Sequence, residues 1–107
     1  MMNHSQWLAA MIMEQVLLGK NLDKSFQLVL TKYNNEAENL PQIKDMTYGA
    51  IRDLGKSTFY INKLVKNKIE NLCIESLLHI VLFQINHARS NDFTLVNQAV
   101  DAAKKID

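Results

Sequence analysis

The chain has 107 residues, which suits one compact domain with a single modest core and excludes a second domain. Its 12 Lys and Arg residues against 11 Asp and Glu residues give a net charge of +1, which excludes a globally polybasic binder of nucleic acid or anionic membranes. Any basic surface must therefore be local. The single cysteine, Cys73, excludes an intrachain disulfide and suits a reducing cytoplasm, where we expect the protein to act.

The first predicted helix covers about Ser5–Leu18, with Ser5 as a suitable N-cap and Gly19 at its end. Its apolar residues occupy more than one side, which predicts a helix buried among others. This stretch lacks a basic leader, is interrupted by Glu14, and is shorter than the ~20 residues of a membrane span. We therefore expect neither a signal peptide nor a membrane partner.

The second predicted helix covers Asp23–Tyr33, and a polar loop over residues 34–40 follows it. One long helix is predicted for Pro41–Asn67, because apolar side chains keep returning to one side and the proline falls in the first turn. Gly49 and Gly55 weaken this helix by up to about 1 kcal/mol each relative to Ala. They indicate a bend or the close approach of another helix.

The segment Leu72–Asn86 carries apolar side chains on two sides, which predicts the central helix of a bundle. A turn at residues 89–92 precedes the last predicted helix, whose apolar stripe comprises Val96, Ala99, Val100 and Ala103. No strand pattern or repeat occurs, so the predicted fold class is all-α. Because neither a glycine cap nor a proline stop follows this helix, we expect the natural protein to continue beyond Asp107.

The residue types that support catalysis form no set. Helix geometry separates His79 and His87 by about 80°, and with His4 they make no metal site. Cys73 and His79 project from nearly opposite sides of one predicted helix and cannot form a nucleophile–base pair. The isolated glycines form no phosphate-binding loop, and the carboxylates form no evident buried pair. We expect no catalytic, metal-binding or cofactor-binding residue here, and a protein that acts by binding.

Basic side chains gather on one side of the predicted long helix. At about 100° per residue, four of them fall within a single arc opposite the apolar stripe: Arg52, Lys56, Lys63 and Lys66. The aromatic residues Tyr48 and Phe59 project into the same arc. Residues 52–68 contain five basic residues and one acid, Asp53, so their local charge is +4.

This arc suits RNA, because basic groups neutralise phosphates while aromatic rings stack on splayed bases. We predict that it binds RNA through five residues: Arg52, Lys56, Phe59, Lys63 and Lys66. The alternative is an ordinary solvated helix face, with Tyr48 and Phe59 covered by a neighbouring helix.

Four runs of residues, in order, resemble motifs of one family. The aromatic-Gly-x-aliphatic-Arg signature of NusB-like domains resembles Tyr48-Gly49-Ala50-Ile51-Arg52, and the segment that follows it in rRNA methyltransferases resembles Ile61-Asn62-Lys63-Leu64. Further along, Leu82-Phe83-Gln84-Ile85 is similar to the family's leucine-aromatic-Gln/Glu-leucine stretch. Val96-Asn97-Gln98-Ala99-Val100, with Ala103-Lys104, is similar to its V-N-E-A-V…A-K helix. The resemblance covers about Leu8 to Lys105.

The best match is the N-terminal domain of bacterial 16S rRNA cytosine-C5 methyltransferases. The resemblance implies a NusB-like helical bundle of about five helices over residues 1–107, truncated before the family's last helix. It also implies that the domain recruits 16S rRNA, while a downstream methyltransferase domain of the same chain uses S-adenosylmethionine. The proline–cysteine motif and the cofactor loops of that enzyme are missing here, so no cofactor is expected in this part.

The same resemblance leaves two alternatives. A free-standing antitermination factor of the family would bind RNA together with a ribosomal protein, but the clustered arginines that begin its first helix are absent from Met1 to Trp7. Gln98 also stands where the family usually has Glu, which changes a polar contact without threatening the helix. The second alternative is a module whose basic face docks onto its own catalytic domain without touching RNA.

Overall fold

The computed structural model describes residues 5–33 and 40–106, which form six helices and no strand. The helices are α1 (Ser5–Leu17), α2 (Leu22–Lys32), α3 (Leu40–Arg52), α4 (Leu54–Leu64), α5 (Leu72–Asn86) and α6 (Asp92–Ile106). The predicted all-α bundle is confirmed. The predicted loop at residues 34–39 and His4 lie outside the described residues, and Leu40 already belongs to α3. Within the described ranges, no helix has the length and apolar character needed to cross a membrane.

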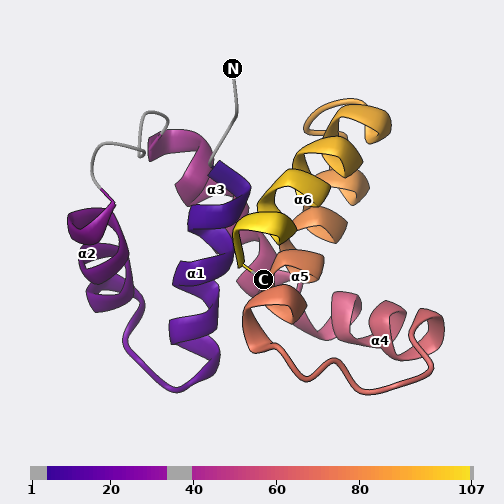
Figure 1. Ribbon diagram of the computed structural model, residues 1–107, viewed down its shortest axis with the longest axis horizontal. Helices are drawn as coiled ribbons and strands as arrows, with labels where there is room; N and C mark the ends of the chain where they lie inside the picture. Colours follow the sequence, from indigo (N-terminus) through magenta and orange to yellow (C-terminus); the bar gives the residue numbers. More distant parts are fainter. Residues whose placement is uncertain (1–4, 34–39, 107) are drawn as a thin grey trace.

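The core is built around α1 and α5. In Figure 1, α1 runs through the middle of the molecule, with α2 on one side and α5 and α6 on the other. Helix α1 packs against α2, α3, α5 and α6, while α5 packs against α1, α3, α4 and α6. This explains why both helices are apolar on more than one side, as their sequences predicted. The stripe predicted for the last helix is divided, because Ala99 packs partly against the core while Val96 and Val100 are exposed.

Gly49 marks the crossing of α3 and α5. A Cβ added at this position would lie 2.2 Å from two ring carbons of Phe83, so only a glycine lets the helices approach this closely. The expected close approach is therefore confirmed at Gly49. At Gly55 an added Cβ would meet nothing within 4 Å, so that glycine serves no such contact.

The single helix predicted for Pro41–Asn67 is wrong, because the chain bends at Asp53. This residue has φ −91° and ψ 12°, outside the α-helical region, and it separates α3 from α4. Its carboxylate accepts a hydrogen bond of 2.8 Å from Nε2 of His87, in the turn after α5. The bend turns α4 away from the axis of α3, so that α4 projects sideways from the bundle, at the lower right of Figure 1, and packs against α5. Helix α4 ends at Leu64 and not at Asn67.

Polar contacts fix the segments on either side of α5. The side chain of Asn71 accepts hydrogen bonds from the backbone N–H groups of Cys73 and Ile74, at 2.9 and 3.1 Å, and so caps the start of α5. After α5, Arg89 donates two hydrogen bonds to the Asp45 carboxylate on α3, at 2.8 and 3.1 Å. The turn that follows α5 is thereby tied to α3, next to the bend from which α4 departs.

Candidate nucleic-acid interface

Three of the five residues predicted to bind RNA lie on the outward side of α4. Lys56, Phe59 and Lys63 are all exposed, and their spacing places them along one side of the helix. The Nζ atom of Lys63 lies 4.7 Å from the centroid of the Phe59 ring. The opposite side of α4 is buried through Ser57 and Ile61. The predicted division of this segment into an apolar and a cationic side therefore holds within α4.

The other two predicted residues do not join this helix face. Arg52 is exposed at the end of α3, on the far side of the bend at Asp53. Lys66 lies in the connection between α4 and α5, where it lines a shallow hollow together with Lys68 and Glu75. Both are exposed cations near α4, but the structure places neither on its helical surface.

Two residues that the sequence analysis did not single out complete the outward side of α4. Tyr60 and Leu64 are 38% and 75% exposed, and they follow Lys56 at intervals of one helical turn. We refer to this surface as the α4 face; it comprises Lys56, Phe59, Tyr60, Lys63 and Leu64. The helical spacing that relates Lys56 to Lys63 was the signal that could have identified both additional residues.

The aromatic residue Tyr48 belongs elsewhere. Its ring lies 5.5 Å from that of Phe26, centroid to centroid, so Tyr48 packs partly against α2 instead of extending the α4 face. The alternative in which a neighbouring helix covers the rings thus describes Tyr48 in part. It does not describe Phe59, which is 55% exposed.

A buried hydrogen bond holds α4 against α5. The hydroxyl oxygen of Ser57 lies 3.2 Å from the backbone carbonyl oxygen of Leu54 and makes a shorter hydrogen bond, of 2.5 Å, with Nδ1 of His79 on α5. Which of the two atoms donates in the contact between Ser57 and His79 depends on the tautomer of the imidazole. Burial lowers the pKa of His79, an effect that the nearby Glu75 carboxylate partly opposes. His79 is therefore a neutral structural residue at neutral pH.

The electrostatic field of the α4 face comes from lysines without nearby acids on the same surface. The one acid between residues 52 and 68 is Asp53, whose carboxylate is engaged by His87 at the bend. The stack of Lys63 on Phe59 contributes only about 0.5–1 kcal/mol at an exposed site. The face therefore presents mobile ammonium groups beside accessible rings, an arrangement that suits phosphates and bases.

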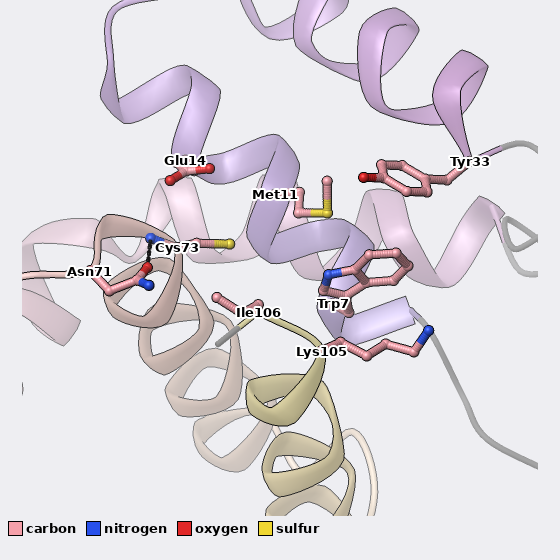
Figure 2. A pocket seen from close by; sticks show the side chains of 8 residues that line it. All are labelled: Trp7, Met11, Glu14, Tyr33, Asn71, Cys73, Lys105 and Ile106. Carbon is pink, nitrogen blue, oxygen red and sulfur yellow. Dashed lines mark hydrogen bonds between the residues drawn. The ribbon is translucent and has the colours of Figure 1, made fainter.

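A hollow of about 310 Å³ opens on another part of the surface, lined by Trp7, Met11, Glu14, Tyr33, Asn71, Cys73, Lys105 and Ile106 (Figure 2). Burial, with a smaller contribution from Glu14, raises the pKa of the Cys73 thiol to about 12. A thiol in this state is protonated at neutral pH and is a poor nucleophile. Trp7 packs edge-on against Tyr33 and under the ammonium of Lys105. The hollow is thus a packing junction of helices with no activated group.

In the part of the chain that the structure describes, no three His, Cys, Asp or Glu side chains come close enough to hold a metal ion. Comparison with known proteins gave one family match: the sequence fits the model described as the NusB family over residues 3–107. No curated protein and no solved structure matched the chain.

Proposed function

This chain belongs to the NusB family, which indicates that it binds RNA, and from this premise we propose that it is the RNA-recruiting N-terminal module of a 16S rRNA cytosine-C5 methyltransferase. Arg52, Lys56, Phe59, Lys63 and Lys66 contact RNA. Methyl transfer from S-adenosylmethionine takes place in a downstream domain of the parent chain.

The observation that carries the proposal is the α4 face. Lys56 and Lys63 lie on one exposed helical surface with a ring between them, and this surface projects from the bundle where an extended ligand can reach it. Lysines that neutralise phosphates release counterions, so each contact strengthens binding and makes it more sensitive to salt. Arg52 and Lys66 extend the basic surface beyond the two ends of α4.

Two features support the methyltransferase over the antitermination factor. The run Ile61-Asn62-Lys63-Leu64 resembles the methyltransferase segment, and α1 contains no Lys or Arg. In addition, the first residues of α1, Ser5, Gln6 and Trp7, are buried, so they offer no RNA contact. The antitermination factor is the second candidate because it shares the family. The native mass of the natural protein discriminates between them, since an enzyme is several times heavier than 12.3 kDa.

The test is a salt titration of RNA binding. The double variant Lys56→Ala/Lys63→Ala should bind a 16S rRNA fragment more weakly than the wild type. The log–log slope of affinity against salt should flatten by about one to two units, because two phosphate contacts are lost. Lys20→Ala/Lys24→Ala removes the same charge from exposed positions at α2 and serves as the matched control.

An unchanged slope in the Lys56/Lys63 variant, with the control also unchanged, would exclude the α4 face from RNA binding. The remaining role for the face would be docking onto the catalytic domain. Association of the two domains, measured at low and at moderate salt, tests that role directly.

A further inference from the structure

Phe59 and Tyr60 form an exposed pair of rings on the α4 face. Their centroids lie 5.9 Å apart, and the ring planes meet at 67°. Both side chains point outward from α4, whose buried side is formed by Ser57 and Ile61, so the pair contributes little to the core. Two exposed rings at a steep angle offer a corner in which a third flat group can stack on one ring and meet the edge of the other.

The ammonium of Lys63 covers one face of the Phe59 ring. Its Nζ atom lies over the ring of Phe59, at 4.7 Å from the centroid. A cation–π contact at an exposed site is weak, whereas an ammonium–phosphate contact is a charge-assisted hydrogen bond. A ligand that carries both a phosphate and a flat ring can therefore draw Lys63 away and take its place on Phe59.

We propose that the corner of Phe59 and Tyr60 is a binding site for one unpaired nucleobase, and that Lys63 moves from the Phe59 ring to a phosphate of the same nucleotide when RNA binds. This inference rests on the proposed RNA-binding function and adds to it a specific site, a new contact residue in Tyr60, and a displaced side chain. Lys56, one turn before Tyr60 on the same side of α4, is placed to meet a neighbouring phosphate.

The shape of α4 explains why the base must be unpaired. Bases inside an A-form duplex are stacked on one another, and the major groove is too deep and narrow for side chains to read them. Helix α4 lies at the side of the bundle (Figure 1), and its rings project from a helix surface. Such a ring can stack only on a base whose face is not already covered by a neighbouring base. The ligand class is therefore a nucleotide in a loop, a bulge or an unpaired end.

Competition between two RNAs tests the site. Binding of a short unstructured RNA and of a blunt-ended RNA duplex of the same composition, which has no loop and no unpaired end, is measured by fluorescence anisotropy. Wild-type protein should prefer the unstructured RNA. Phe59→Leu, which keeps apolar bulk but removes the ring on which the base stacks, should reduce that affinity about tenfold, the loss expected for one base–aromatic stack. Tyr60→Leu removes the ring that meets the edge of the base and should reduce the affinity by a smaller factor. Phe59→Tyr should retain the preference.

The salt dependence separates failure of this site from failure of the proposed function. Phe59→Leu should leave the salt slope unchanged, because no charge is lost, whereas Lys56→Ala should flatten it. If the leucine variants bind like wild type while the lysine variants bind weakly, RNA binding stands and the nucleobase site is refuted. If the lysine variants also bind like wild type, the function proposed for the α4 face is refuted as well.

The movement of Lys63 has its own readout in NMR spectra. The ammonium of Lys63 lies over the Phe59 ring, so we expect the ring current to shift the signals of the adjacent methylene protons upfield in the free protein. Addition of the unstructured RNA should return these signals to ordinary positions, and Phe59→Leu should show ordinary positions without RNA. Signals that stay shifted upfield in the saturated complex would refute the displacement.

Discussion

The crossing of α3 and α5 at Gly49 can be tested by replacing this glycine with alanine. The added Cβ would lie 2.2 Å from Cε1 and from Cζ of Phe83, far inside the ~3.5–4.0 Å of an ordinary contact between carbon atoms. The atoms that it meets belong to a rigid ring, and Phe83 is only 1% exposed. Either the ring or one of the helices must therefore move.

The surroundings of Phe83 leave the ring little room. The imidazole of His87 lies 4.6 Å from it, and the guanidinium of Arg89 lies 5.2 Å from its centroid. Overpacking of a core costs about 1–3 kcal/mol, and the severe overlap here places the cost near the upper end. The higher helix propensity of alanine offsets up to about 1 kcal/mol of that cost. We therefore expect Gly49→Ala to lower the free energy of unfolding by roughly 2 kcal/mol.

Urea unfolding followed by far-UV circular dichroism measures this loss, and Gly55→Ala is the matched control. An added Cβ at Gly55 meets nothing within 4 Å, so the control should gain up to about 1 kcal/mol from propensity alone. In a Phe83→Leu background, which lacks the clashing ring atoms, Gly49→Ala should cost much less. If Gly49→Ala is as stable as the wild type while the ring is present, the packing argument is wrong.

Two further predictions concern buried titratable groups. Because burial lowers the pKa of His79, the unfolded chain binds a proton that the folded chain resists, so the free energy of unfolding should fall as the pH drops from 6.5 towards that lowered value. His79→Asn, whose amide can donate to or accept from Ser57 without titrating, should flatten this part of the urea-unfolding profile, and parallel profiles would refute the assignment. Because the pKa of Cys73 is raised from 9.0 to about 12, its thiolate fraction should be roughly a thousandfold below that of an ordinary thiol. Alkylation by iodoacetamide should therefore be slow in buffer and fast in urea, and equal rates would contradict the burial of the thiol.

Local pattern was sufficient to predict most of the helices. The first helix was predicted over about Ser5–Leu18 and α1 spans Ser5–Leu17, and the two-sided apolar character of α1 and α5 correctly placed both at the centre. These features depend only on residues within a single helix, and so the periodicity of the sequence is sufficient to predict them. The close approach of helices at Gly49 was also expected, because a glycine destabilises a helix interior unless the missing side chain makes room for a neighbour.

The bend at Asp53 could not be predicted in this way. Asp53 belongs to both helical ladders at the bend: its N–H donates to the carbonyl of Gly49 at the end of α3, and its carbonyl accepts from the N–H of Ser57 at the start of α4. No proline or polar run interrupts the sequence here, and apolar residues keep their helical spacing through the bend, so the sequence resembles one helix. The contact that accompanies the bend comes from His87, 34 residues away, and a local pattern contains no information about so distant a partner.

The same limit explains why two residues of the predicted arc, Lys66 and Tyr48, do not lie on α4. Lys66 was placed on the RNA-binding arc because the helix was expected to continue to Asn67. Tyr48 was placed there because its contact with Phe26 depends on where α2 packs, which helical spacing does not report. Lys56, Phe59 and Lys63 fall within α4 itself, so their common side followed from helical spacing alone. Tyr60 and Leu64 obey that spacing too and lie on the same side of α4.

In α4, the residues that hold the helix in the bundle are separate from those that face solvent. Its inner residues, Ser57 and Ile61, meet α5 and carry the packing, while every residue of the α4 face points to solvent. Substitutions on that outer surface leave the buried contacts of the bundle untouched. Ligand preference can therefore drift or be redesigned on one short helix while the same core persists, so that closely similar bundles need not share a target.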